Sequence, residues 1–449
     1  MHSLKLDGSV FRIKIDPFSF IMVNQLKAIP GSRYWMELDK TWSIPATVQG
    51  VEALENLMNH YTFDIEMDAM CYMQEIKETL QKTEALTKAS DSNVDETGIN
   101  LPLHPFQRVC VAYGLSVKRY IIADEMGLGK TVEFLALLSA SKAYPALVVC
   151  PSSLKLLWFR EASKWIRNVS IRIVDGNVTP SQVEGIKIVI TSYDVLGRDY
   201  NAGDLVKRTF TPKSGGIIDV LQNVGFTTLC ADESHYLKNN KAARTRAVKF
   251  LSDGFEYRVL MSGTPILNRP SEIISQLEVI DRLQDLGGFW KFVHRYCGAY
   301  SGTYSLDIKG ASNLGELNDL LRKTCYIRRT KEEVMPELPP KQRSYVPVEI
   351  TNRKDYESAE SDFIRWIMEN EPEKASSAYR AKEMVKMNYL RMMCAKGKME
   401  AMNQWIKEFE TEKLIFFAHH KVIQNEIRSL HKGSLRIHGD DNVTIRQGY

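Results

Sequence analysis

The stretch Ile121-Ile122-Ala123-Asp124-Glu125-Met126-Gly127-Leu128-Gly129-Lys130-Thr131 predicts a strand followed directly by a glycine-rich turn, and the apolar spacing of residues 132–138 continues it as a helix. Glycines let backbone N–H groups approach phosphate oxygens, and the positive end of the next helix attracts the same charge. We therefore expect this turn to hold a nucleotide's phosphates. The Lys130 ammonium would reach the β and γ phosphates, and the Thr131 hydroxyl would hold Mg²⁺.

A second apolar strand, residues 227–231, ends in Asp232-Glu233-Ser234-His235. Two adjacent carboxylates at a strand end can divide the work of phosphoryl transfer between them. Asp232 is expected on the side of the metal, and Glu233 is expected to orient or deprotonate the attacking water. The predicted catalytic residues are thus Lys130, Asp232 and Glu233, and the predicted cofactors are ATP and Mg²⁺.

Three motifs occur in the order that one family uses. The form D-E-M-G-L-G-K-T at 124–131, with Asp124 where such loops usually open on glycine, resembles the Swi/Snf branch of superfamily-two helicases and translocases. D-E-x-H at 232–235 and S-G-T-P at 262–265, continuing into I-L-N-R, resemble the same family. The resemblance implies that His235, Ser262 and Thr264 couple the nucleotide site to DNA. It also implies nucleotide contacts along the whole loop, from Asp124, Glu125, Met126, Gly127, Leu128, Gly129, Lys130 and Thr131.

Shorter motifs extend this resemblance. Residues 103–107, L-H-P-F-Q, match the family's L-x-P-[FY]-Q, which places Gln107 against the adenine edge. Ser152 and Ser153 follow the apolar strand 146–150, and Thr191 ends another strand, as in the family's DNA-contacting motifs. Serines at strand ends also cap helices, and the two roles are compatible.

Near the N-terminus, I-P-G-S-R-Y at 29–34 with K-T-W-S-I-P at 40–45 resembles the HARP module of HepA-related annealing helicases. The resemblance implies DNA binding at forks or junctions. Arg33 and Lys40 would meet phosphates, while Tyr34, Trp35 or Trp42 would stack on unpaired bases. The alternative is that the tryptophans form the core of a small module, which we expect for at least one of them.

The predicted fold class is α/β, a RecA-like parallel sheet motor with a small N-terminal α+β module. We expect a HARP-like module at 1–80, a polar linker at 81–100, a first RecA-like lobe at 101–345, a helical inter-lobe segment at 346–397 and the beginning of a second lobe at 398–449. In the second lobe, strands are expected at 413–420 and 435–438 around a helix at 422–430. Residues 328–341 resemble the family's segment between lobes, whose basic residues would brace the lobes or approach DNA. Lys331 and Glu332 are expected on the surface of a helix end.

We expect the second lobe to be incomplete in this sequence. No Q-x-x-x-R-x-x-R stretch occurs between Lys398 and Tyr449, although an arginine from this lobe contributes about 10³–10⁵ to the rate of phosphoryl transfer in related enzymes. We expect the remainder of the lobe in cis beyond Tyr449 or from another chain. The 449-residue chain alone should bind ATP and DNA with little DNA-stimulated hydrolysis, unless it already holds the required arginine. The candidates are Arg428, Arg436 and Arg446.

Composition limits the function further. The formal net charge is only +4, so a DNA-binding surface must be a local patch. Seven scattered cysteines without a C-x-x-C pair disfavour a zinc ribbon or a disulfide framework. No apolar run approaches the roughly 20 residues that span a bilayer, so we expect a soluble intracellular protein of the cytoplasm or nucleoid with no membrane partner.

The function predicted from the sequence is that of an ATP-dependent DNA helicase or translocase that acts on branched or forked DNA in annealing, branch migration or fork remodelling. The predicted partner is forked, branched or duplex DNA. One alternative is a double-strand translocase that displaces bound proteins. Another, from a different class, is a DNA-binding clamp that does not hydrolyse ATP.

Overall fold

The computed structural model describes residues 2–35, 40–199, 210–301, 306–363, 365, 369, 382–409, 411–431 and 433–437. Its two compact units are Met1–Leu338 and Pro339–Tyr449. No helix in the described part of the chain combines the length and the apolar character needed to cross a bilayer.

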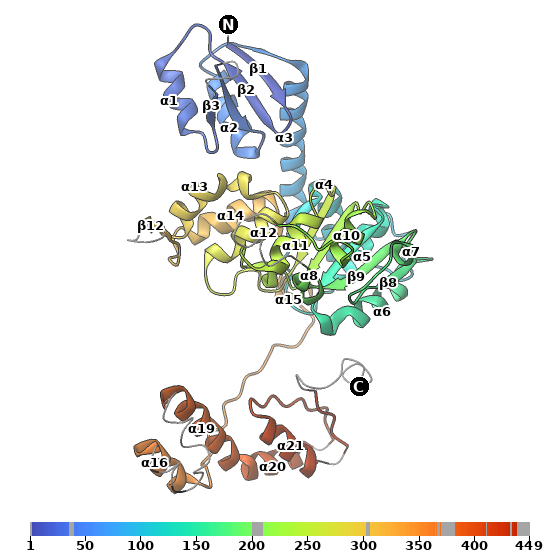
Figure 1. The fold of residues 1–449 in the computed structure, drawn as a ribbon, viewed down its shortest axis with the longest axis vertical. Helices are drawn as coiled ribbons and strands as arrows, with labels where there is room; N and C mark the ends of the chain where they lie inside the picture. The colour runs from blue at the N-terminus through green and yellow to red at the C-terminus, as the bar shows by residue number, and fades with distance from the viewer. Residues whose placement is uncertain are drawn as a thin grey trace. The chain divides into compact units, whose positions relative to one another are not determined.

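The N-terminal part of the first unit is a small mixed sheet with three helices (Figure 1). Its strand order is β3-β4-β2-β1-β5, antiparallel except where β1 meets β5. Alternation turns Leu4, Phe11 and Ile13 inward onto one core with helical side chains. The strands are β1 (His2–Asp7), β2 (Val10–Lys14), β3 (Arg33–Trp35), β4 (Thr41–Pro45) and β5 (Phe63–Ile65). The helices are α1 (Phe20–Ala28), α2 (Val48–Met58) and α3 (Met67–Lys88).

Residues 81–100, expected to form a polar linker, are partly helical and are held to the rest of the first unit by specific contacts. Helix α3 continues to Lys88, inside the range 81–100. Beyond it, Asp91 forms an ion pair with Arg108 at 2.7 Å, and buried Ile99 forms a β-bridge with Ile166. The sequence prediction missed this because a single apolar anchor such as Ile99 has no periodicity to detect.

The larger part of the first unit is built on a seven-stranded, wholly parallel sheet of order β14-β6-β11-β10-β7-β9-β8. The chain crosses the sheet from β6 through β7 to β8 and then returns through β9 and β10 to β11. The strands are β6 (Arg119–Ile122), β7 (Ala146–Cys150), β8 (Ile171–Ile173), β9 (Ile188–Ser192), β10 (Thr228–Asp232), β11 (Tyr257–Met261) and β14 (Tyr326–Ile327).

Right-handed crossovers place the helices of the outward path on one face and those of the return on the other. The outward group is α5 (Lys130–Ser141) and α6 (Lys155–Trp165), and α5 packs against both α6 and α4 (Pro105–Val117). The return group is α7 (Pro180–Val183), α8 (Tyr193–Arg198), α10 (Ile217–Gln222) and α11 (Ala243–Leu251). After β11 come α12 (Ile274–Val279), α13 (Gly288–Tyr296), the hairpin of β12 (Tyr300–Ser301) and β13 (Leu306–Asp307), α14 (Leu314–Thr324) and α15 (Lys331–Val334).

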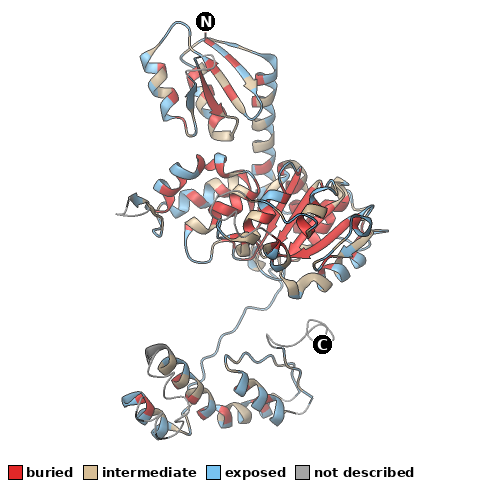
Figure 2. Ribbon diagram, in the orientation of Figure 1, coloured by how far each residue is buried: buried red, intermediate tan, exposed pale blue. Residues whose placement is uncertain are grey.

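Four inner strands, β11, β10, β7 and β9, are mostly apolar and buried along their whole length, as expected of a parallel sheet covered on both faces (Figure 2). Since all strands are parallel, their carboxyl ends lie at one edge, where ligands of open α/β sheets bind. Strands β6, β11 and β10 are neighbours, so the loops that follow them meet. The predicted α/β class, with a parallel-sheet core and a small N-terminal α+β module, is confirmed.

The second unit contains α16 (Arg353–Ser361), α19 (Lys382–Gly397), α20 (Met399–Glu408) and α21 (Lys421–Leu430). The predicted helix at 422–430 therefore forms, but the two strands expected around it do not. Residues 413–418 and 435–437 have no strand structure, and Ile415 and Phe417 are 82% and 96% exposed. A strand needs neighbours for its backbone groups, and the described residues of this unit supply none.

Candidate active site

The glycine-rich turn between β6 and α5 has the backbone that a phosphate-binding loop needs. Gly127 and Gly129 have φ angles of 90° and 91°, a region that only glycine adopts without strain. The Lys130 ammonium donates to the carbonyl oxygens of Asp124 at 2.8 Å and Glu125 at 3.4 Å. These bonds hold the ammonium against the loop that is expected to bind the phosphates of a nucleotide.

Gln107 lies beside the same loop and is buried. Its side-chain Oε1 accepts from the backbone N–H of His104 at 3.0 Å, and its Nε2 donates to the carbonyl of Leu128 at 3.1 Å. A β-carbon at Gly129 would lie 2.6 Å from that Nε2, so only glycine leaves room for the contact. The amide thus links the start of α4 to the phosphate loop, and each end retains capacity for one further hydrogen bond.

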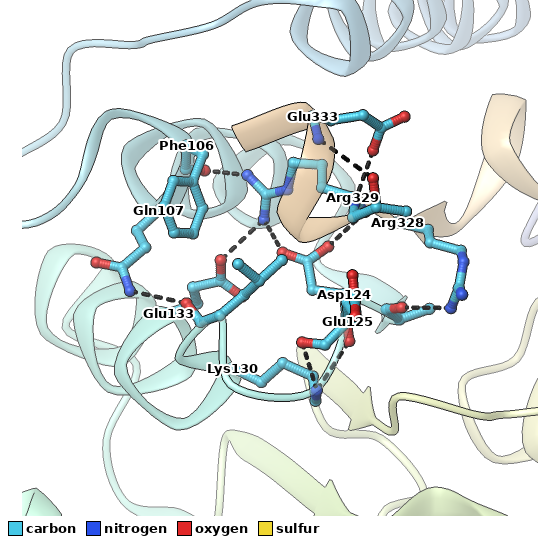
Figure 3. A network of polar contacts seen from close by, with 12 residues as sticks. Phe106, Gln107, Asp124, Glu125, Lys130, Glu133, Arg328, Arg329 and Glu333 are labelled. Carbon is cyan, nitrogen blue, oxygen red and sulfur yellow. Dashed lines mark hydrogen bonds and ion pairs between the residues drawn. The ribbon is translucent and has the colours of Figure 1, made fainter. Parts of the chain in front are cut away.

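Asp124 was predicted to contact nucleotide, and its side chain lies elsewhere. It is fully buried and forms an ion pair with Arg329, whose backbone N–H also donates to Asp124 Oδ1 at 3.0 Å (Figure 3). Arg329 also contacts Glu133 at 2.8 Å and donates to the carbonyl of Phe106. The pairing of this half-buried arginine with two buried carboxylates explains why the loop opens on aspartate. This position therefore binds another part of the chain, which corrects the prediction for its side chain.

The partner carboxylate in that cluster, Glu133, has a strongly perturbed environment. Burial raises the pKa of Glu133 well above its ordinary value, the neighbouring Asp124 raises it further, and Arg329 opposes both. The cluster holds α5, the phosphate loop and the segment after β14 in one arrangement.

Arg328 was not singled out as a site residue by the sequence. Its guanidinium donates to the carbonyls of Ala123 at 2.9 Å and Gly263 at 3.1 Å, joining the strand before the phosphate loop to the S-G-T-P motif. The doubled arginine at 328–329 was a visible signal, but the two partners of Arg328 lie 205 and 65 residues away in sequence.

The two predicted catalytic carboxylates lie at the end of β10. Asp232 Oδ2 accepts from the indole nitrogen of Trp158 at 2.9 Å, and Oδ1 accepts from the backbone N–H of Glu233, also at 2.9 Å. Glu233 has a φ of 50°, a left-handed conformation uncommon outside glycine and often found at functional sites. The turn gives the neighbouring side chains separate environments, with Asp232 buried and Glu233 half-buried.

Burial raises the pKa of Asp232 above its ordinary value. The hydrogen bond from Trp158 and the positive charge of Lys130 act in the opposite direction, while the charge of Glu233 adds to the increase. The phosphate loop and the acidic motif lie at the same edge of the sheet, because they follow β6 and β10 on either side of β11.

The structure brings together the acidic motif and the S-G-T-P motif. His235 Nδ1 lies 3.2 Å from Glu233 Oε2 and 3.3 Å from Ser262 Oγ, and the backbone N–H of Thr264 donates to the same Ser262 oxygen at 3.2 Å. A parallel link runs from Ser234 through Gln276, whose amide donates to the carbonyl of Pro265 at 2.7 Å. The three predicted coupling residues therefore form one chain of contacts starting at Glu233.

The residues of this site fit Mg²⁺ better than a metal ion whose ligands all come from the protein. Mg²⁺ prefers oxygen ligands and keeps several waters, so one or two protein groups with substrate phosphates suffice. Asp232 and Thr131 would supply a carboxylate and a hydroxyl for this purpose, and each Asp232 oxygen retains a lone pair beside its one hydrogen bond. Among the described residues no group of three or more His, Cys, Asp or Glu could hold a metal on its own.

The DNA-contacting candidates of the large sheet separate into accessible and inaccessible residues. Ser152 Oγ donates to Asp194 at 2.9 Å, and Ser153 is exposed in the same turn. Thr191 is fully buried, and its hydroxyl donates to the carbonyl of Val174 at 3.0 Å. The prediction that Thr191 touches DNA is wrong for this structure, because β9 lies inside the sheet with both faces covered.

The N-terminal candidates separate in the same way. Arg33 and Lys40 are exposed, whereas Trp42 is only 6% exposed and belongs to the core of the module. The predicted DNA contact of Trp42 is therefore wrong for this structure, and the alternative core role holds. Tyr34 and Trp35 are 47% and 39% exposed. Residues 36–39, between β3 and β4, lie outside the described residues.

The arginines proposed to complete the site belong to the second unit. Arg428 is exposed on α21, and Arg436 contacts the side chain of Asn425. Arg446 lies outside the described residues.

Residues 48–411 match the family SNF2-related domain. A Caenorhabditis elegans protein named SWI/SNF-related matrix-associated actin-dependent regulator of chromatin subfamily A-like protein 1 homolog is 29% identical, over 97% of this chain and 61% of its own length. The Bos taurus protein named DNA annealing helicase and endonuclease ZRANB3 is 32% identical, over 71% of this chain and 29% of its own length. The chain thus spans less than two thirds of these curated relatives.

A solved structure, the Sulfolobus solfataricus SWI2/SNF2 ATPase core in complex with dsDNA, is 22% identical with a TM-score of 0.45. The similarity covers 75% of this chain and 71% of that one.

Proposed function

The chain belongs to the SNF2-related domain family of ATPases, and on that basis we propose that it couples ATP hydrolysis to movement along forked or branched DNA. The observation that carries the proposal is the meeting of three motifs at the carboxyl ends of β6, β10 and β11. These are the phosphate loop, the acidic pair and S-G-T-P, and they lie on adjacent strands.

In the proposed reaction, each polar group of the site has one task. Lys130 leaves the loop carbonyls to pair with the β and γ phosphates, and the loop N–H groups bind the same oxygens. Thr131 and Asp232 hold Mg²⁺, which when bound neutralises part of the phosphate charge. Glu233 orients the attacking water and accepts its proton.

Coupling to DNA follows from the contacts of Glu233. His235 lies between the Glu233 carboxylate and Ser262, so a shift of the S-G-T-P segment changes the orientation of Glu233, the proposed general base. Trp158, on α6 just after Ser152 and Ser153, bonds to Asp232 and gives a second route between these serines and the metal-side carboxylate. Hydrolysis would then depend on whether DNA occupies the serine-bearing turn.

The preference for forked DNA is assigned to the N-terminal module. Exposed Arg33 and Lys40 offer charge for phosphates, and the half-exposed rings of Tyr34 and Trp35 offer stacking surfaces for unpaired bases. The curated relative named DNA annealing helicase and endonuclease ZRANB3 supports DNA as the substrate.

The test compares ATP hydrolysis by the full-length protein with no DNA, linear duplex and forked DNA of equal length. We expect the forked DNA to stimulate most, and strand annealing to require hydrolysable ATP. Equal stimulation by linear and forked DNA, with displacement of a bound protein, would favour a protein-displacing translocase. DNA binding without hydrolysis would favour a clamp.

A further inference from the structure

Lys331, expected at the surface of a helix end, lies against the phosphate loop. The backbone brings it there: β14 pairs with β6, and the N–H of Glu125 donates to the carbonyl of Arg329 at 2.9 Å. The N–H of Lys331 then donates to the Glu125 carboxylate at 2.8 Å. The sequence could not show this, because the register of β14 on β6 decides it.

The side chain of Lys331 continues over the loop. A β-carbon built at Gly127 would lie 3.3 Å from Lys331 Nζ and 3.4 Å from its Cε, so the end of the lysine packs directly on this glycine. Gly127 is the first of the two loop glycines with positive φ. The ammonium therefore lies where the loop is expected to receive phosphate.

This ammonium has no other use in the described part of the chain. Among the ion pairs and side-chain hydrogen bonds found there, none involves Lys331 Nζ. The neighbouring Arg328 and Arg329 are different, because each guanidinium group already donates to backbone carbonyls or buried carboxylates of the same unit. A positive charge held at a phosphate loop without an acidic partner is suited to an anionic ligand.

We propose that Lys331 is a second phosphate-binding lysine, which contacts the polyphosphate of ATP together with Lys130. The proposal rests on the function proposed above, because it needs the loop to bind ATP. It adds a regulatory consequence. Lys331 lies shortly before the boundary of the first unit at Leu338, so nucleotide binding would fix the start of the segment that leads to the second unit.

The test separates charge from packing with two substitutions. Lys331→Met keeps the length of the side chain that packs on Gly127 but removes its charge, whereas Lys331→Arg keeps the charge. Lys309→Met removes an exposed lysine elsewhere in the same unit and is the matched control. Equilibrium binding of Mg-ATP is measured for the 449-residue chain and each variant, with thermal melting to confirm folding.

We expect Lys331→Met to weaken ATP binding roughly tenfold, as loss of one partly screened charge pair does. Lys331→Arg should stay within about threefold of the parent by the same electrostatic reasoning, and Lys309→Met should match the parent. Unchanged binding in Lys331→Met would overturn the proposal, as would equal loss in the Met and Arg variants, since that indicates packing alone. If the parent itself fails to bind ATP, the proposed function fails instead.

Discussion

The indole nitrogen of Trp158 donates a 2.9 Å hydrogen bond to the carboxylate of Asp232. Trp158 lies on α6 and Asp232 ends β10, so the contact joins the turn of Ser152 and Ser153 to the proposed metal-side carboxylate. Trp158 is fully buried. Burial raises the pKa of Asp232, and the hydrogen bond from the Trp158 N–H is the strongest influence that lowers it. One hydrogen bond thus ties the ionisation of Asp232 to the turn expected to meet DNA.

Trp158→Phe should shift the acidic limb of the pH–rate profile to higher pH. Burial already raises the pKa of Asp232, and losing the indole donor removes an influence that lowers it, so the pKa rises further. The ionised carboxylate needed for Mg²⁺ then forms only at higher pH, and activity lost in acid should return as pH rises. The measurement is kcat/KM against pH. Trp165→Phe on the same helix, whose indole contacts Glu161, is the control, and superimposable profiles for Trp158→Phe and parent would contradict the prediction.

Glu233→Gln should bind ATP but hydrolyse it at least about a hundredfold more slowly, since general-base contributions are about 10²–10⁴. Glutamine keeps the shape of the side chain and loses the ability to accept the proton. Single-turnover hydrolysis with prebound ATP measures the chemical step, and Glu256→Gln, at a surface ion pair with Lys118, is the control. Turnover at the parent rate would transfer the base role to another residue.

Ser262→Ala should lower DNA stimulation more than it lowers the DNA-free rate. The serine oxygen contacts His235 and accepts from the N–H of Thr264, so alanine breaks the link between Glu233 and the S-G-T-P segment. Removing one hydrogen bond corresponds to roughly a two- to tenfold fall in the stimulation ratio. The ratio of rates with and without DNA is the readout, and an unchanged ratio would exclude this route of coupling.

The N-terminal module should respond differently at its core and at its surface. Trp42→Ala removes a buried ring and should reduce the free energy of unfolding by about 3–5 kcal/mol. Arg33→Ala and Lys40→Ala should leave the melting temperature unchanged and reduce the salt dependence of DNA binding. Each lost phosphate contact reduces by about one the slope of the logarithm of the binding constant against the logarithm of the salt concentration. Unaltered slopes in both surface variants would place the DNA-binding surface elsewhere.

Local motifs predicted where most of the candidate site lies in the fold, because each one carries its own strand end and turn. The phosphate loop, the acidic pair and S-G-T-P needed only the parallel sheet to bring them together. Contacts between residues far apart in the sequence could not be predicted from local motifs. The sequence places Asp124 in the loop, whereas its partner Arg329 becomes visible only when β14 pairs with β6.

Burial accounts for other differences between the site residues predicted from the sequence and their observed positions. A strand-end threonine and a tryptophan in a polar motif look accessible in sequence, yet Thr191 lies inside the sheet and Trp42 inside the module. Residues 413–418 have the composition of a strand, but strand formation depends on neighbouring strands that the described residues of the second unit do not provide.

The most direct test of the account is Lys130→Ala in the full-length protein, assayed in one preparation for ATP hydrolysis and for DNA binding. Lys130 reaches the proposed phosphate site and its ammonium donates to carbonyls of its own loop, so alanine should abolish turnover and leave DNA affinity largely intact. ATP hydrolysis by Lys130→Ala at the parent rate would contradict the assignment of residues 124–131 as the nucleotide site, and with it the proposed ATPase motor.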